Sequence, residues 1–132
     1  VQADAGFPPF RSQCADAVLV DAPCTGLGAL GRRSDARWHI EKAAIERLAE
    51  QQLRILNASC QLLKPGGILT YSVCTFTKEE TIGVAEAFAS QNTNMKPVIL
   101  EGQRWRHLGT GGIILPQDYG TDGMSVFQWR LA

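Results

Sequence analysis

The sequence has 132 residues, about the length of one domain, and its 13 lysines and arginines balance its 13 aspartates and glutamates. Hydrophobic residues make up 45% of the chain and charged residues 20%, which excludes a disordered segment and a collagen-like fibre. Zero net charge also excludes a global positive field, so any contact with nucleic acid must come from a local basic patch.

The sequence also lacks the patterns of a membrane span, a secretory signal and a metal site. No apolar stretch approaches the roughly 18 residues of a span, and the first ten residues lack the basic start and apolar core of a signal peptide. The two histidines have no metal-ligand spacing, and no C-x-x-C pair occurs among Cys14, Cys24, Cys60 and Cys74. We expect a cytoplasmic protein with reduced thiols and no bound metal. Because residue 1 is not Met, we also expect a piece of a longer chain.

A short apolar strand and a glycine-rich loop are the first elements that the sequence predicts. Residues 17–20 (AVLV) form a continuous apolar run before Asp21, which is typical of a parallel strand buried on both faces. One proline and three glycines interrupt the following loop over residues 22–31. A basic turn follows at residues 32–38.

Two helices are predicted in the middle of the chain. Over residues 41–63, apolar side chains recur at three, four and seven positions without Gly or Pro, which indicates a long amphipathic helix. This helix is expected to end at the turn 64–67 (KPGG), because proline cannot continue a helix. Thr77 and Glu80 have the spacing of a capping box and predict a second helix over residues 77–90.

The remaining elements are predicted to be strands. Strands are expected at residues 68–72, 97–100 and 125–131, and the Gly-rich segment 103–123 is expected to be irregular except for a short strand at 113–115. The order of strands and helices predicts an α/β sheet with right-handed crossovers.

Two of these strands are followed by a polar residue and then a cysteine. Asp21 precedes Cys24, and Ser72 precedes Cys74. Ligands bind at the carboxyl ends of the strands in such sheets, and adjacent parallel strands bring these ends to one edge. A single cysteine after a strand is more often a packing residue than a catalytic one. Two of them at neighbouring strand ends predict one site with a pair of thiols.

Three segments of the sequence resemble bacterial 16S ribosomal-RNA methyltransferases of the Sun/Fmu (RsmB) type. They read DAPCTGLGALGRRSDARW, LLKPGGILTYSVCT and GTDGMSVFQWRL, and the resemblance covers nearly the whole chain. It implies a Rossmann-like class I methyltransferase fold that uses S-adenosylmethionine, with a mixed sheet and an antiparallel last strand. It also implies that residues 1–132 are only the C-terminal part of the catalytic domain, because the family's Gly-rich cofactor loop and N-terminal RNA-binding region are absent from the sequence.

The resemblance implies methylation of carbon 5 of a cytidine in 16S ribosomal RNA, and the chemistry of that reaction explains a need for thiols. Carbon 5 of cytosine is a poor nucleophile until a thiolate adds at carbon 6 and pushes electron density onto it. The family match makes Cys74 the attacking nucleophile and Cys24 the residue that assists release of the RNA. It places Asp4, at the end of a strand, and Asp21 in the cofactor pocket, although Asp21 would also suit the charge that develops on the pyrimidine.

Other residues near these motifs are interpreted as RNA-binding, as shaping the site, or as structural. Arg32, Arg33 and Arg37 would hold RNA phosphates, or would form an exposed and merely solvated turn. Gly26 and Gly28 would let the loop backbone approach the base, and residues 121–123 would shape the site as a tight turn. Cys14 and Cys60 are interpreted as structural.

Two other function classes stay open at this point, and a third is set aside. The chain would also suit a non-catalytic RNA-binding or assembly module that keeps the methyltransferase fold. A methyltransferase acting on an exocyclic amine is disfavoured, because such enzymes use a [DN]-P-P-[YFW] loop without a thiol. A Cys–His hydrolase using His39 or His107 is disfavoured as well, because no motif of that class accompanies these residues.

Overall fold

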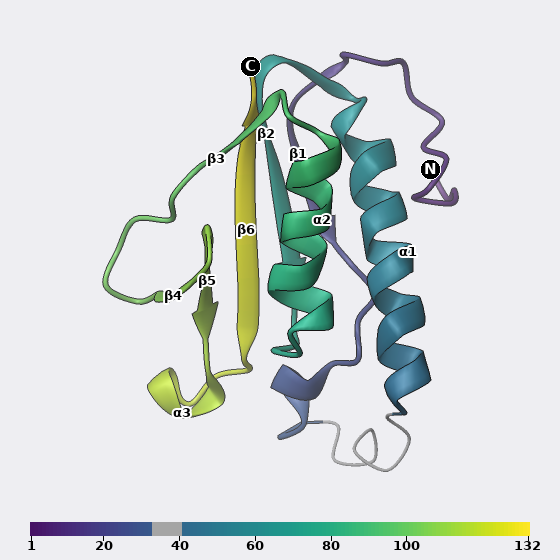
Figure 1. Cartoon of the computed structure of the whole chain (residues 1–132). Coiled ribbons are helices and arrows are strands. Elements are labelled where there is room, and N and C mark those ends of the chain that lie inside the picture. The colour runs from purple at the N-terminus through teal and green to yellow at the C-terminus, as the bar shows by residue number, and fades with distance from the viewer. Residues whose placement is uncertain (33–40) are drawn as a thin grey trace.

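The computed structural model describes residues 1–32 and 41–132. Figure 1 shows one sheet with helices packed against it. The elements in chain order are β1 (Ala15–Asp21), a 3-10 turn (Leu27–Ala29), α1 (Lys42–Cys60), β2 (Leu63–Val73), a π-helical turn (Glu79–Gly83), α2 (Val84–Gln91), β3 (Met95–Pro97), β4 (Arg106–Leu108), β5 (Gly111–Ile114), α3 (Pro116–Tyr119) and β6 (Met124–Leu131).

The sheet is mixed, with the strand order β1-β2-β6-β5-β4 and with β3 paired to β6. β1 and β2 are parallel neighbours, and β6 runs antiparallel to β2, as predicted for the last strand. Asp21 at the end of β1 pairs with Ser72 of β2, and Val73 pairs with Ser125 at the start of β6. The loops after β1 and β2 and the turn before β6 therefore meet at one edge of the sheet.

The core lies between the sheet and the helices α1 and α2, which cover the same face of the sheet in Figure 1. Alternate residues of β2 and β6 point into this core, as the period of two requires. Phe88 of α2 packs edge-on against Trp129 of β6, with 4.8 Å between the ring centroids. The largest fully buried side chains include Trp129, Tyr71, Phe88, Phe127, Leu56, Leu63 and Leu69. Each such burial stabilises the fold by about 1.5–3 kcal/mol.

The segment KPGG was predicted to be a turn between helix and strand, and this prediction is wrong. The long helix ends at Cys60, and β2 already begins at Leu63. The register between β1 and β2 jumps there, from Ala15 paired with Leu63 to Ala17 paired with Ile68. The extra residues therefore form a bulge within the strand, and Gly66 takes a positive φ of 79° that few other residues tolerate.

Most of the other predicted elements are present with shifted boundaries. The second helix begins with a π-helical turn and continues as α2, and β3 lies two residues before the strand predicted at 97–100. The segment 103–123 contains two strands and a short helix, where one strand was predicted. Within residues 1–32 and 41–132, no helix is long and apolar enough to span a bilayer.

β1 lies at the edge of the sheet, and within the described part of the chain its one strand neighbour is β2. The side chain of Leu19 on this strand is 67% exposed. An unpaired edge next to an exposed apolar side chain favours association with another strand.

We expect the isolated 132-residue chain to self-associate, and Leu19→Lys to increase the monomer fraction in sedimentation velocity. Ile99→Lys, which changes an exposed apolar residue outside the strands, is the control, and a monomeric unmutated chain at high concentration would refute this expectation.

Candidate active site

The two thiols that the sequence predicts to meet lie side by side. Cys24 follows β1 and Cys74 follows β2, and their sulfur atoms are 3.4 Å apart. Both residues are partly exposed, and neither is part of a disulfide. The predicted convergence of the two loops is confirmed.

The surroundings of Cys24 keep this thiol protonated at neutral pH. Burial, and next the hydrogen bond to Cys74, raise the pKa of Cys24 to about 12. The S–H of Cys24 is therefore available to donate a hydrogen bond to the sulfur of Cys74.

A buried amide side chain on α1 holds Pro23 in the loop that follows β1. Gln52 donates from Nε2 to the carbonyl oxygen of Pro23 over 2.9 Å, and its side chain is completely buried. The hydroxyl oxygen of Tyr71 lies 2.9 Å from Oε1 of Gln52 and 2.7 Å from the carbonyl oxygen of Glu80, and its single O–H is shared between these two acceptors. Burial, and next the charge of Glu80, raise the pKa of Tyr71, so its hydroxyl remains a donor. The turn that carries Cys24 is thus tied to the core.

Glu80 is part of this site, although the sequence indicates only a helix cap. Its backbone N–H does contact Oγ1 of Thr77 over 3.4 Å, as in a cap. Its carboxylate, however, is buried and faces the cysteine loops, where it accepts hydrogen bonds from Thr25 and Gln52. For Gln52 the sequence indicates only that the side chain faces the core, since it falls on the same helical stripe as Leu48 and Ile55.

Gly28 joins the two cysteine loops and the turn before β6 through its backbone. Its N–H donates to the carbonyl oxygen of Cys74 over 2.9 Å, and its own carbonyl oxygen accepts from the N–H of Gly123 over 2.8 Å. A Cβ atom at Gly28 would overlap the backbone of Gly123. Glycine at position 28 therefore lets two backbone segments approach each other closely. This contact is consistent with the expectation that residues 121–123 shape the site. Gly26 has a positive φ of 71° and turns the chain between Cys24 and Gly28.

Gly28→Ala is expected to disturb this junction, because the new methyl group would meet backbone atoms that cannot move aside. We expect the free energy of unfolding of the whole protein to fall by about 1–3 kcal/mol, measured by urea denaturation. Gly31→Ala is the matched control, since none of the described residues has an atom within 4 Å of a Cβ atom there. Equal stability of the two variants would contradict the close contact of Gly28 and Gly123.

Asp21 lies at the mouth of a small pocket beside the cysteine loops. The pocket has a volume of about 160 Å³ and is lined by Ala5, Leu19, Val20, Asp21, Ala22, Pro23, Ile55 and Ser59. Small-molecule sites usually measure about 300–1,000 Å³, so this pocket by itself is smaller than a complete site of that kind. The exposed carboxylate of Asp21 fits the ammonium group at the methionine end of S-adenosylmethionine, and the apolar walls fit its uncharged parts.

Asp4 was predicted to end a strand, and this prediction is wrong. Residues 1–4 form no strand, and Asp4 instead begins a turn in which its Oδ1 accepts from the N–H of Gly6 over 2.7 Å. This hydrogen bond is the largest cause that lowers the pKa of Asp4; desolvation opposes it, and the guanidinium of Arg54 lowers the pKa further. The side chain is about half exposed, and its neighbour Ala5 lines the pocket of Asp21.

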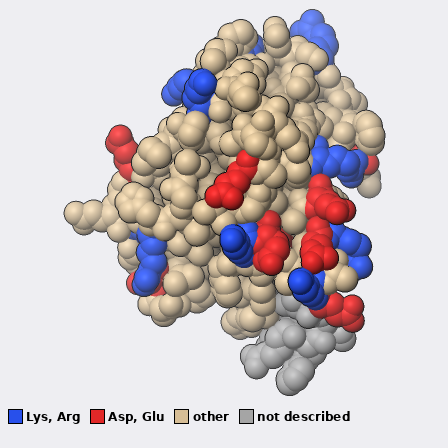
Figure 2. All heavy atoms as spheres, viewed as in Figure 1, with Lys and Arg blue, Asp and Glu red and all other residues tan. Residues whose placement is uncertain are grey.

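The basic residues near the site are described only in part. Arg33 and Arg37 lie outside the described residues. Arg32 is 77% exposed and forms an ion pair with Asp122 in the turn before β6, with 3.4 Å between Nε and Oδ1. On the face shown in Figure 2, acidic and basic side chains are interspersed.

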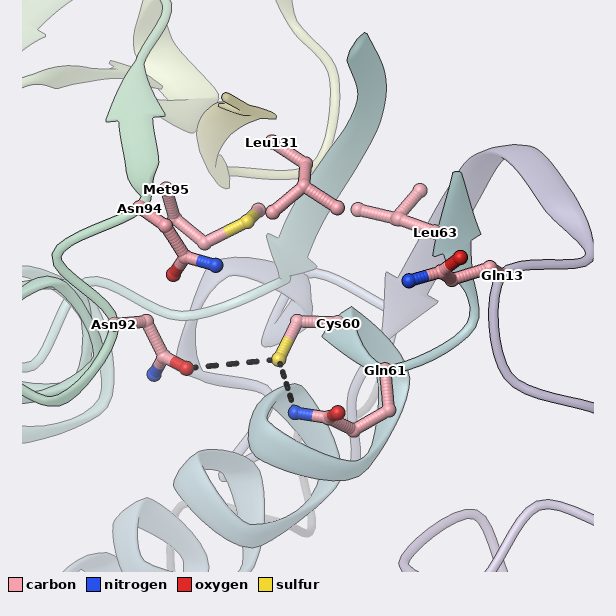
Figure 3. A pocket seen from close by; sticks show the side chains of 8 residues that line it. All are labelled: Gln13, Cys60, Gln61, Leu63, Asn92, Asn94, Met95 and Leu131. Atoms are coloured by element: carbon pink, nitrogen blue, oxygen red, sulfur yellow. Dashed lines mark hydrogen bonds between the residues drawn. The ribbon is translucent and has the colours of Figure 1, made fainter. Parts of the chain in front are cut away.

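The other two cysteines lie away from this edge of the sheet. Cys60 is buried at the end of α1, as its structural interpretation predicts, and burial raises its pKa. Figure 3 shows it in a pocket of about 190 Å³ where its sulfur contacts Gln61 and Asn92. Cys14 is exposed, so a packing role for it is wrong. Within residues 1–32 and 41–132, no three potential metal ligands come together.

Comparisons with known proteins identify the family of the chain. The family model described as 16S rRNA methyltransferase RsmB/F matches residues 2–130. The chain belongs to the RsmB/F family. Ribosomal RNA small subunit methyltransferase B of Thermus thermophilus is 40% identical over 63% of this chain and 21% of its own length. The methyltransferase B of Vibrio cholerae is 34% identical over 91% of this chain and 27% of its own length.

A solved structure extends the RsmB/F match to three dimensions. The crystal structure of NSun6 from Pyrococcus horikoshii with SFG superposes with a TM-score of 0.79 and 30% identity, over 99% of this chain and 34% of that one. The predicted Rossmann-like methyltransferase fold is thereby confirmed. The chain spans about a quarter of the length of the curated RsmB/F relatives described above.

Proposed function

We propose that the protein methylates carbon 5 of a cytidine in 16S ribosomal RNA, and that this chain is the C-terminal part of its catalytic domain. The observation that carries the proposal is the 3.4 Å distance between the sulfurs of Cys24 and Cys74 at the carboxyl edge of the sheet. The names of the curated relatives, which are ribosomal RNA small subunit methyltransferases, support the substrate class. The proposal includes a cytoplasmic location, where thiols stay reduced.

Cys74 acts as the nucleophile in this proposal. Its thiolate forms a bond to carbon 6 of an unstacked cytosine, and the electron pair of the 5,6 double bond moves toward carbon 5 and the ring. The assignment to Cys74 rests on the resemblance of the segment LLKPGGILTYSVCT to the family. Burial of Cys24 raises the pKa of that thiol, which makes Cys24 a weaker attacking group. Carbon 5 would then take the methyl group of a bound donor, and the bond between that methyl group and the donor's sulfonium sulfur would break with its electron pair left on the sulfur.

Cys24 acts when the bond between RNA and protein breaks. A base removes the proton from carbon 5, the 5,6 double bond forms again, and the sulfur of Cys74 leaves carbon 6 with its electron pair. The S–H of Cys24 lies within reach of this sulfur and donates to it as negative charge develops there. This hydrogen bond makes Cys74 a better leaving group and explains why release would need a second cysteine.

S-adenosylmethionine is the proposed methyl donor, and when bound it would supply an electrophilic methyl group on a sulfonium sulfur. The relative NSun6 was crystallised with SFG, an analogue of this cofactor. Asp21 would hold the ammonium group of the cofactor, and Asp4 would border the same pocket. Arg32, Arg33 and Arg37 are proposed to contact phosphates of the RNA.

A nucleoside analysis tests the proposed function. The whole protein is incubated with unmethylated small-subunit ribosomal RNA and S-adenosylmethionine labelled in the methyl group, and the RNA is digested to nucleosides. The label is expected in 5-methylcytidine. Label in a nucleoside methylated on an exocyclic amine would replace the proposal with the amine reaction. RNA binding without any label would indicate a non-catalytic binding or assembly module.

A further inference from the structure

The buried carboxylate of Glu80 lies beneath both cysteine loops. Its side chain is fully buried, and the hydrogen-bond donors that the described residues offer it are all uncharged. Placing a carboxylate in such surroundings costs free energy unless its lone pairs are filled by donors. A position of this kind indicates that the carboxylate organises the groups around it.

The hydrogen bonds of Glu80 reach the residue after each cysteine. Oε1 accepts from the backbone N–H of Thr25 over 2.9 Å and from Nε2 of Gln52 over 3.1 Å. Oε2 accepts from the hydroxyls of Thr25 over 2.6 Å and Thr77 over 2.8 Å, and it contacts the hydroxyl of Thr75 at 3.4 Å. The hydroxyls of Thr25 and Thr75 are themselves 2.9 Å apart. One side chain therefore joins the two Cys–Thr pairs, Cys24–Thr25 and Cys74–Thr75.

We propose that Glu80 is a positioning residue that sets the distance between the sulfurs of Cys24 and Cys74. Thr25 and Thr75 follow these cysteines directly, so fixing the two threonines fixes the backbone from which each thiol extends. The inference rests on the proposed function, because the spacing matters for catalysis only if both sulfurs act on one cytosine. A displacement of about 1 Å in a catalytic group is enough to lower a rate by about 100-fold.

The substitution Glu80→Gln tests this role with little change of shape. An amide keeps one acceptor oxygen but introduces an NH₂ group among donors. The backbone N–H of Thr25 cannot turn away, so the oxygen of the new amide must face it. The NH₂ group then takes the place of Oε2, and the hydroxyls of Thr25 and Thr77 must turn to accept from it. Glu80→Ala removes every one of these bonds. Glu79→Gln is the matched control, because Glu79 is the adjacent glutamate and is exposed.

Thiol cross-linking measures the spacing without any need for activity. Dibromobimane becomes fluorescent when it bridges two nearby thiols, and peptide mass spectrometry identifies the Cys24–Cys74 product in the whole protein. We expect the unmutated protein and Glu79→Gln to give the same rate of bridging. Glu80→Gln should slow bridging by about tenfold, the effect of one mispaired buried donor, and Glu80→Ala by more.

Steady-state kinetics gives a second readout that a general loss of stability would not produce. We expect Glu80→Gln to lower kcat by about tenfold while KM for S-adenosylmethionine changes by less than about twofold. Unchanged bridging and unchanged kcat in a folded Glu80→Gln protein would overturn the inference, even if Glu80→Ala does not fold. If the whole protein forms no 5-methylcytidine but bridging still depends on Glu80, the proposed function fails and the positioning role stands.

Discussion

The Cys74→Ala variant of the whole protein is expected to lose methyl transfer by about 10⁴-fold or more, because the step that activates carbon 5 would have no nucleophile. Cys24 is not expected to replace Cys74 in this variant, because burial, the largest cause that raises the pKa of Cys24, remains after Cys74 is removed. The measurement is the rate of label transfer from S-adenosylmethionine to ribosomal RNA.

Cys14→Ala is the control for this experiment, because Cys14 is exposed and has no place in the site. It is expected to transfer methyl groups at the rate of the unmutated protein. A Cys74→Ala protein with normal turnover would remove Cys74 from the chemistry and would leave the nucleophile unassigned.

The Cys24→Ala variant is expected to accumulate a covalent complex between protein and RNA. Attack by Cys74 and methyl transfer do not need the second thiol, whereas departure of Cys74 would lose its hydrogen-bond donor at 3.4 Å. The complex should appear as a slowly migrating band in a denaturing gel and should carry the labelled methyl group.

The double variant Cys24→Ala/Cys74→Ala is the control and should give no such band. If Cys24→Ala releases methylated RNA at the rate of the unmutated protein, Cys24 has no part in release. If the single and double variants give the same band, the adduct does not involve Cys74.

The meeting of Cys24 and Cys74 could be predicted from the sequence because it depends on strong local signals. An apolar run of strand length precedes each cysteine loop, and parallel neighbours bring their carboxyl ends to one edge. The alternation of the last strand was equally clear, and β6 spans Met124–Leu131.

The roles of Glu80 and Gln52 could not be predicted because they depend on contacts across long sequence distances. The spacing of Thr77 and Glu80 fits a helix cap, and nothing local indicates that the carboxylate turns toward Thr25, 55 positions away. Gln52 lies on an apolar helical stripe, but its partners Pro23 and Tyr71 belong to other elements.

The errors of the sequence analysis have physical causes as well. Proline and glycine mark both turns and strand bulges, and only the register of β1 against β2 separates the two for the segment KPGG. A strand before Asp4 would need a neighbour to complete its hydrogen bonds, and residues 1–4 have none among the described strands.

The proposed function depends on one covalent bond between a cysteine and a cytosine. RNA that carries 5-fluorocytidine at the target position tests for it, because fluorine replaces the proton whose removal allows the RNA to leave. The unmutated whole protein is incubated with this RNA and S-adenosylmethionine, digested, and analysed by peptide mass spectrometry. The account predicts a modified cytidine attached to the peptide that contains Cys74. A nucleotide attached to Cys24 instead, or the absence of any attached nucleotide, would contradict it.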